Sequence, residues 1–368
     1  MKRSFCVGTY SEPILFGTGE VFHGKGKGLY FCTFEDGEIR VENVLPLRNP
    51  SFFCIHERAQ RIYAVNELKE YEGSFGGGIS ELSYTDDGEL KLLRSFCTGG
   101  TDPCHVALSN DGSYIAVSNF ASGSVSVFPI ESDGTMSGER RLFQHEGSSI
   151  HPKRQTGPHA HSAIFSRDGS FCVPDLGIDR LVRYNAEGTA KTGEVALKAG
   201  SGPRFGEFSL DERHFYLINE IASSVTHFTV EDGVFTERET VSTLPEEYEG
   251  ENICSDLHLH PNGRFLYASN RGHDSICVFC VEGDGSLRQI ERVPCGGRTP
   301  RNFCIAPGGE YALVGNQDSD NITTFRLGAD GRMSVVSVTA FPTPVCIRFF
   351  NLYDTMGLPK AAVPKNMR

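Results

Sequence analysis

The chain has 368 residues, with 35 Lys and Arg against 47 Asp and Glu, a formal net charge of −12 and no Trp. An acidic chain without a long Lys/Arg run lacks the positive surface that attracts nucleic acids or anionic membranes, and no stretch approaches the roughly 20 apolar residues of a membrane span. We therefore expect a cytoplasmic protein that binds neither nucleic acid nor membrane. The sequence leaves its oligomeric state open.

Taken in chain order, the strand-like segments follow a repeating frame. Residues 4–10 resemble the second strand of a unit that lacks a first strand, and residues 344–350 resemble a first strand after which the unit stops. Between them, six units each run from the start of one strand, through a short turn, to an Asn or Asp that ends the next strand. These pairs are Pro50 and Asn66, Pro103 and Asn119, His161 and Asp175, Pro203 and Asn219, Cys254 and Asn270, and Pro300 and Asn316.

The spacing of these units predicts the fold. From Asn66 to Asn316 is 250 residues in five steps, so the mean period is 50. About four short strands per unit, Gly-rich turns and no amphipathic helix are typical of a β-propeller blade. We expect an all-β, seven-bladed propeller of four-stranded antiparallel blades in a single domain, residues 1–350, followed by a tail, residues 351–368. The two chain ends would share one blade and close the ring, leaving no open sheet edge.

Polar residues recur at two positions of the frame. The start of an innermost strand and the end of its antiparallel neighbour lie at the same edge of a blade, so residues there should surround the mouth of the central channel. The strand starts supply His161, Arg204, Asp256 and Arg301, and the strand ends supply Glu67, Asp175, Glu220, Arg271 and Gln317. Lys153 and Arg154, on the long loop before His161, would add positive charge. The sequence therefore predicts a polar site at the hub.

The residues that depart from the repeat are the strongest candidates for function. Charged residues such as Arg204, Glu220 and Arg271 occur at these positions in only some blades. An Arg or Glu beside a channel must be desolvated, form an ion pair or take part in function. A ring of ion pairs that holds blades together is the structural alternative. His161 suits general acid or base chemistry because its ordinary pKa is near neutrality. We predict no metal, because His258 and His260, which could complete a ligand set with His159 and His161, lie well into their strand and away from the mouth.

Four segments together are similar to the seven-bladed propeller lactonases and to the fungal carboxymuconate cyclases that share their fold. They read Gly202-Pro203-Arg204, Tyr216-Leu217-Ile218-Asn219-Glu220, Phe265-Leu266-Tyr267-Ala268-Ser269-Asn270-Arg271-Gly272-His273-Asp274-Ser275-Ile276 and Thr299-Pro300-Arg301-Asn302-Phe303. The resemblance implies a metal-free enzyme that opens a lactone, or forms one in the cyclase branch. The active residues that it implies are His161, Arg204, Glu220 and Arg271. Phe205 stands where many members have His.

The leading hypothesis is hydrolysis of a sugar lactone, foremost 6-phosphogluconolactone, without a cofactor. Glu220 or His161 would activate water as a general base, and Arg204 and Arg271 would hold the substrate anion and the oxyanion. The remaining residues of the mouth would bind substrate, namely Arg301, Asp256, Asp175 and Glu67. Two alternatives stay open: a carboxymuconate-type cyclase and a non-enzymatic propeller that binds a ligand through the same mouth.

Overall fold

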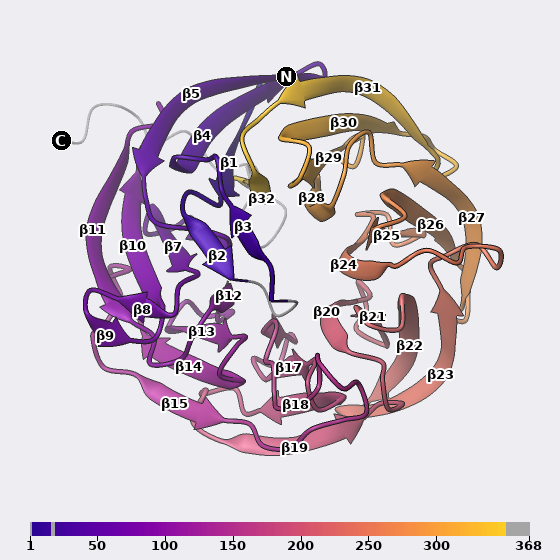
Figure 1. Ribbon diagram of the computed structural model, residues 1–368, viewed down its shortest axis with the longest axis horizontal. Coiled ribbons are helices and arrows are strands. Elements are labelled where there is room, and N and C mark those ends of the chain that lie inside the picture. The colour runs from indigo at the N-terminus through magenta and orange to yellow at the C-terminus, as the bar shows by residue number, and fades with distance from the viewer. Residues whose placement is uncertain (1, 16–18, 351–368) are drawn as a thin grey trace.

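The computed structural model shows a ring of seven blades around a central axis (Figure 1). It describes residues 2–15 and 19–350, which form 32 strands. Each blade is a four-stranded antiparallel sheet, and two further two-stranded hairpins stand apart from these sheets. No helix in this part of the chain is long and apolar enough to cross a membrane. The all-β, seven-bladed prediction is therefore confirmed, while the predicted tail, residues 351–368, lies outside the described residues.

Each blade is built from four strands that follow one another from the hub outward. Blade 1 has β32 (Pro344–Phe349), β1 (Arg3–Thr9), β4 (Gly28–Glu35) and β5 (Glu38–Pro46); blade 2 has β6 (Phe53–His56), β7 (Arg61–Asn66), β10 (Gly78–Tyr84) and β11 (Leu90–Cys97); blade 3 has β12 (Pro103–Leu108), β13 (Tyr114–Asn119), β14 (Ser124–Pro129) and β15 (Arg141–Gln144). The extra hairpins are β2 (Pro13–Leu15) with β3 (Val21–His23), and β8 (Glu70–Tyr71) with β9 (Ser74–Phe75).

Blades 4 to 7 follow the same order without insertions of this kind. Blade 4 has β16 (Ile164–Phe165), β17 (Phe171–Asp175), β18 (Arg180–Tyr184) and β19 (Lys191–Ala196); blade 5 has β20 (Pro203–Phe208), β21 (His214–Asn219), β22 (Ser224–Glu231) and β23 (Val234–Ser242); blade 6 has β24 (Ile253–Leu259), β25 (Phe265–Arg271), β26 (Ser275–Val281) and β27 (Leu287–Pro294); blade 7 has β28 (Pro300–Ile305), β29 (Tyr311–Asn316), β30 (Asn321–Leu327) and β31 (Met333–Ala340).

Both ends of the chain contribute to blade 1. The last described strand, β32, pairs antiparallel with β1 in a register that sets Phe5 opposite Phe349 and Gly8 opposite Cys346. The innermost strand of this blade therefore comes from the C-terminal part of the chain, and its next strand from the N-terminal part. This pairing joins the two ends of the ring as predicted and covers the inner edge that β1 would otherwise expose.

The core lies between neighbouring blades. All six residues of β13 are buried, whereas β23, an outermost strand, has only exposed and half-buried residues. One apolar cluster joins Phe265 and Tyr267 of blade 6 to Phe303 and Val314 of blade 7. Each such side chain contributes about 2 kcal/mol when it is withdrawn from water. Sheet-on-sheet packing between blades, repeated around the ring, therefore supplies the main stabilisation of the fold.

A repeated tyrosine contact links consecutive blades. Each of these tyrosines lies near the start of its blade's second strand and donates its phenolic hydrogen to a backbone carbonyl of the next blade, at 2.6–2.9 Å. The pairs are Tyr63 with Gly134, Tyr114 with Ala186, Tyr216 with Gly285, and Tyr267 with Gly331. A buried hydroxyl needs a partner, so this contact fixes the angle between blades while it satisfies the phenol.

Candidate active site

The register of the blades brings the two predicted positions together. Pro203 pairs with Asn219 and Pro300 with Asn316, so the start of each innermost strand lies beside the end of the second strand. A β-bulge follows the first residue of the innermost strand in these blades, which turns two successive side chains toward the axis. Arg204 and Phe205 therefore both line the small hub cavity.

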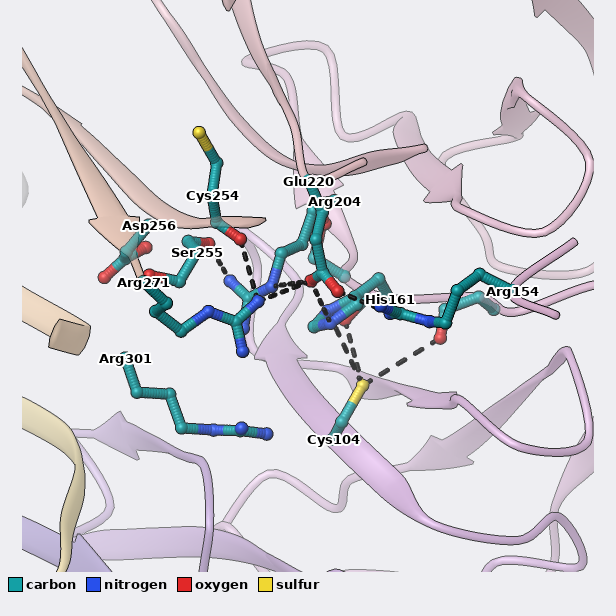
Figure 2. Close-up of polar contacts among 12 residues, drawn as sticks. Cys104, Arg154, His161, Arg204, Glu220, Cys254, Ser255, Asp256, Arg271 and Arg301 are labelled. Carbon is teal, nitrogen blue, oxygen red and sulfur yellow. Dashed lines mark hydrogen bonds and ion pairs between the residues drawn. The ribbon is translucent and has the colours of Figure 1, made fainter. Parts of the chain in front are cut away.

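Glu220 is the centre of the site, and three arginines converge on its carboxylate (Figure 2). Arg154 Nη2 donates to Oε1 at 2.5 Å, Arg271 Nη2 lies 2.8 Å from Oε2, and Arg204 Nε lies 2.9 Å from Oε2. The Glu220 side chain is only 4% exposed. A single buried carboxylate thus holds side chains from three different parts of the chain.

The charges around Glu220 determine its protonation. Burial alone would raise the pKa of Glu220, but the guanidinium groups of Arg271, Arg154 and Arg204 outweigh it and hold this pKa well below the usual range. Burial also lowers the pKa of Arg271, to about 10, which leaves this arginine protonated at neutral pH. Glu220 is therefore a carboxylate with low basicity and both oxygens engaged, which makes it a poor acceptor for a proton from water.

Two buried guanidinium N–H groups remain without a well-aligned hydrogen-bond acceptor in the described part of the chain. They are the Nε–H groups of Arg204 and Arg271; the first is close to Glu220 Oε2 but is not directed at it. The other contacts of these side chains go to backbone carbonyls: Arg204 donates from Nη1 to Ser255, and Arg271 donates from Nη2 to Cys254 at 2.8 Å. Because an unsatisfied buried donor is costly, the pair is ready to bind an anion or a negatively charged oxygen.

His161 adjoins this group at the wall of the hub cavity. Its Nε2 lies 3.9 Å from Glu220 Oε2, and its Nδ1 lies 3.7 Å from the sulfur of Cys104. Burial, and next the charge of Arg204, lowers the pKa of His161 well below 6.5, so the imidazole is neutral at neutral pH. Burial raises the pKa of the Cys104 thiol strongly, so this residue is a thiol and not a thiolate. A neutral imidazole has one unprotonated ring nitrogen, so His161 is able to accept a proton.

Arg301 and Glu67 form a second charged pair at the hub. Arg301 Nη2 lies 3.9 Å from Glu67 Oε1, and its guanidinium lies 5.2 Å from the ring centre of Tyr10. Tyr10 in turn donates its hydroxyl hydrogen to Glu67 Oε2 at 2.9 Å. The predicted neighbour Gln317 accepts from Arg301 Nη1 at 3.3 Å. Arg301 and Glu67 both line the same cavity as His161, so the structure brings these predicted residues together.

Asp256 also lines the hub cavity, and its Oδ2 is heavily engaged. This oxygen accepts hydrogen bonds from Asn302 Nδ2 at 2.6 Å and from the Phe303 amide at 3.1 Å, and lies 3.1 Å from His258 Nε2. His258 Nδ1 lies 2.6 Å from Glu207. Burial alone would lower the pKa of His258, but the carboxylates of Asp256 and Glu207 raise it to about 10. All three contacts of the Asp256 carboxylate named here go to Oδ2 and none of them to Oδ1.

Asp175 is a predicted site residue that neither lines the hub cavity nor joins the ion pairs of Glu220; Glu220 and Arg271 do not line the cavity either, but Glu220 contacts Arg204 and His161, which do. Its wholly buried carboxylate lies 2.7 Å from His145 Nδ1 and accepts from the backbone amides of His159 at 2.6 Å and Gly177 at 3.0 Å. The other ring nitrogen of His145, Nε2, lies 2.7 Å from the hydroxyl of Tyr184. Asp175 ends its strand as predicted, but its side chain turns into blade 4.

Arg154 shows where reasoning from the repeat falls short. It lies outside the frame, on the loop before blade 4, and only its position beside Lys153 in a basic pair pointed to it. The loop is anchored by the buried Gln155, whose side chain donates to the Leu176 carbonyl at 2.9 Å and accepts from the His151 amide at 3.0 Å. This anchoring presents Arg154 to Glu220. Lys153 stays exposed.

The histidines considered as metal ligands have other partners. His258 lies between Asp256 and Glu207, and His260 Nε2 lies 2.9 Å from the Gly309 carbonyl. Among residues 2–15 and 19–350, no group of three or more His, Cys, Asp or Glu side chains has an arrangement that could hold a metal ion. The hub is instead a site of arginines around carboxylates and a neutral imidazole.

This architecture has close counterparts among known proteins. A family model described as "Lactonase, 7-bladed beta-propeller" matches residues 4–349. The chain belongs to this family. The 6-phosphogluconolactonase of Bacillus subtilis is 31% identical over 356 residues, which cover 94% of this chain and 97% of that protein. A second protein of that name, from Formosa agariphila, is 31% identical over 319 residues, 82% of this chain and 88% of the relative.

A solved structure supports the same relationship. The periplasmic gluconolactonase of Pseudomonas aeruginosa superposes on this lactonase-family chain with a TM-score of 0.87 and 30% identity, covering 95% of this chain and 99% of that one. The family match and the named relatives together support a hydrolase that opens lactones. The two kinds of relative differ in whether the sugar lactone in their name carries a phosphate.

Proposed function

We propose that this chain hydrolyses 6-phosphogluconolactone to 6-phosphogluconate. The observation that carries the proposal is the charge at the hub: four guanidinium groups, those of Arg154, Arg204, Arg271 and Arg301, face the three carboxylates of Glu220, Glu67 and Asp256. An excess of positive charge in a chain of net charge −12 is suited to an anionic substrate. An arginine side chain can also bind a phosphate group at two points, and two of the Nε–H groups have no well-aligned acceptor among the described residues.

Substrate entry requires the hub to open. The hub cavity has a volume of about 20 Å³, which is room for about one water molecule. Arg154 is the most exposed of the arginines around Glu220, at 14% of its side chain, and it comes from a loop. In this proposal, Arg154 leaves Glu220 as the substrate arrives and pairs with the phosphate, while Arg204 and Arg271 keep their places on the blades.

His161 is the proposed general base. Its neutral imidazole accepts a proton from a water molecule as that water attacks the lactone carbonyl carbon. Glu220 Oε2, 3.9 Å from Nε2, stabilises the imidazolium that forms. The carbonyl oxygen becomes an oxyanion, which the Nε–H groups of Arg204 and Arg271 stabilise. The alternative base, Glu220, is disfavoured because three arginines hold its pKa so low.

The second half of the reaction returns the proton. The tetrahedral intermediate collapses, the bond between the carbonyl carbon and the ring oxygen breaks, and the imidazolium of His161 gives its proton to that oxygen. The product acid then ionises and releases one proton to solvent. Asp256 Oδ1 and the Glu67 carboxylate are placed to accept hydrogen bonds from the sugar hydroxyls, since both side chains line the cavity. Arg301 assists in holding the anion.

The test is a substrate panel with a matched pair of variants. Disappearance of 6-phosphogluconolactone, gluconolactone and a carboxymuconate lactone is measured above the spontaneous rate. We expect acceleration with the phosphorylated lactone, a loss of about 100-fold in kcat/KM in Arg271→Ala, and no change in Arg288→Ala, which pairs with Glu282 on the surface. The absence of acceleration on any sugar lactone would refute the proposal. Turnover of the muconate lactone alone would replace it with the cyclase.

A further inference from the structure

A second, larger cavity lies at the other end of the propeller axis. It has a volume of about 1100 Å³ and is lined by the later halves of the innermost strands and the turns after them, including residues 52–58, 105–112 and 205–210. We call this cavity the funnel. Its size exceeds the roughly 300–1,000 Å³ of ordinary ligand sites. The proposed lactonase reaction makes no use of it.

A belt of rings separates the funnel from the hub cavity. Phe52 and His105 lie with their ring centres 4.1 Å apart, His105 and Phe205 5.9 Å apart, and Phe205 and His258 5.8 Å apart. Phe52, His105 and Phe205 line both cavities, so they form the partition between them. Phe205, the residue that departs from the lactonase pattern, is therefore part of this partition. A ligand in the funnel would not enter the hub.

One residue from each blade forms a ring inside the funnel. In blades 2 to 7 each pairs with the residue three positions before the Asn or Asp of the repeating frame, and in blade 1 with the residue three positions before Thr9, so the seven positions are structurally equivalent. They are Arg348, Cys54, Ala107, Ile164, Glu207, His258 and Cys304, in blade order from 1 to 7. Four are small or apolar and three are charged. The charged residues depart from the repeat and need an explanation beyond folding.

Two of the three charges satisfy each other. Glu207 Oε1 lies 2.6 Å from His258 Nδ1, and its Oε2 accepts from the Leu259 amide at 2.7 Å. Arg348 is different, because its guanidinium has no carboxylate within 4.0 Å among the described residues, and Asp256 and Glu207 act on it only from further away. It packs over the ring of Phe52, 4.9 Å from its centre. A half-buried guanidinium at the wall of a large cavity thus has no carboxylate in direct contact.

We propose that the funnel binds a small organic acid that carries a carboxylate and a flat apolar ring, with the carboxylate paired to Arg348. A single planar guanidinium matches one carboxylate at two points, whereas a phosphate group would call for several cations, as at the hub. The aromatic side chains Phe52, Phe165 and Phe205 line the funnel and offer faces on which a ring can stack. This site is independent of the proposed lactonase activity and would remain if that activity were refuted.

The experiment uses benzoate as the probe and calorimetric titration of the full chain. We expect saturable binding of benzoate, about tenfold or more weaker binding in Arg348→Met, and weaker binding of the neutral analogue benzamide. Arg271→Met, which removes a hub arginine instead, should leave benzoate binding unchanged. Arg348→Lys keeps the positive charge but loses the planar guanidinium that binds a carboxylate at two points. This variant should bind benzoate with intermediate affinity. Thermal unfolding of each variant establishes that it is folded.

Several outcomes would overturn the proposal. They are the absence of saturable benzoate binding, equal binding of benzoate and benzamide, and unchanged binding in a folded Arg348→Met variant. Loss of binding in Arg271→Met would assign the benzoate to the hub. Binding that appears only after residues 351–368 are removed would assign the funnel to the end of the chain itself. Lactonase assays on the same variants test the two sites separately.

Discussion

Arg154 and Glu220 are 66 residues apart in the chain, yet Arg154 Nη2 donates to Glu220 Oε1 at 2.5 Å. The other oxygen of this carboxylate serves Arg204 and Arg271. Glu220 therefore acts as the counter-charge that allows three guanidinium groups to share one small volume. Its role in our interpretation is to position arginines and to stabilise a protonated His161, and the proton itself passes through the imidazole.

Replacing Glu220 by Gln should destabilise the protein, because the buried guanidinium groups lose their counter-charge while the shape is kept. We expect the free energy of unfolding in urea to fall by about 3 kcal/mol. Glu282→Gln is the matched control: it removes a carboxylate from an exposed pair with Arg288, and the change should stay below about 1 kcal/mol. Equal effects of the two substitutions would contradict the assigned role of Glu220.

Replacing His161 by Gln should lower kcat by about 100-fold or more and leave KM nearly unchanged, because the base is lost but the arginines remain. Since the pKa of His161 lies well below 6.5, kcat/KM of the wild type should stay level as the pH falls past 6.5 and decline only at lower pH. The measurement is a pH–rate profile of both proteins. A decline centred at pH 6.5, or an unaffected kcat, would argue against His161 as the base.

Replacing Arg154 by Met should raise KM for 6-phosphogluconolactone by about tenfold or more and change KM for gluconolactone little, because Arg154 is assigned to the phosphate. Lys153→Met removes the same charge from the adjacent, exposed position and serves as the control. The ratio of kcat/KM for the two lactones is the quantity to compare. If Arg154→Met impairs both lactones equally, the arginine does not discriminate by phosphate.

Replacing Asp175 by Asn should lower stability without affecting catalysis. The carboxylate lies 2.7 Å from His145 and accepts two backbone hydrogen bonds inside blade 4, away from the hub cavity. We expect a loss of about 2 kcal/mol in unfolding free energy and an unchanged kcat/KM at a temperature where the variant is folded. A raised KM would restore the sequence-based assignment of Asp175 to the substrate.

Acid should destabilise the protein from about pH 6.5 downward. Burial, and next the charge of Arg348, lowers the pKa of His105, and burial with His214 lowers that of His227 to about 4. Below pH 6.5 these histidines therefore bind protons in the unfolded chain but stay neutral in the folded chain. The free energy of unfolding falls as a result. Melting temperatures from pH 7 to pH 4 check this, and His227→Gln should make their decline shallower. An unchanged slope in that variant would exclude His227 as a cause.

Alkali should destabilise the protein through a different histidine. The pKa of His258 is raised to about 10 by Asp256 and Glu207 against the effect of burial, so its imidazolium stabilises the fold fully below 6.5. This contribution is lost as the pH rises toward 10, because the folded chain then releases a proton that the unfolded chain has already released. His258→Gln should reduce the dependence of the melting temperature on pH above 7. An identical dependence would contradict the pairing.

The repeat in the sequence was sufficient for the architecture. The sixteen-residue frame from Pro203 to Asn219 predicted that strand starts and strand ends share an edge, and the strand register confirms it. The same frame selected His161, Arg204 and Glu220, because each is a charged or titratable residue at a position where only some of the blades have one. Geometry that depends only on strand period and closure is thus readable from a single sequence.

Side-chain direction and loop conformation were not readable in the same way. Asp175 occupies the predicted strand end, but its rotamer faces His145, a residue outside the frame. Arg154 reaches the site only because the buried Gln155 fixes its loop. Arg348 has no carboxylate in direct contact because the nearby Glu207 carboxylate pairs with His258 instead. Each of these outcomes depends on contacts between segments that no local pattern relates.

The shared blade also sets an order of events during synthesis. Since β32 is the last of the described strands, it is translated after every other strand of the ring. Until then, β1 presents an unpaired edge and the ring is open, even though every arginine of the hub has already been translated. A truncated copy that stops before Pro344 would hold all the side chains proposed for catalysis, but we expect it to be inactive. Lactonase activity would therefore report that translation has passed β32 and that blade 1 is complete.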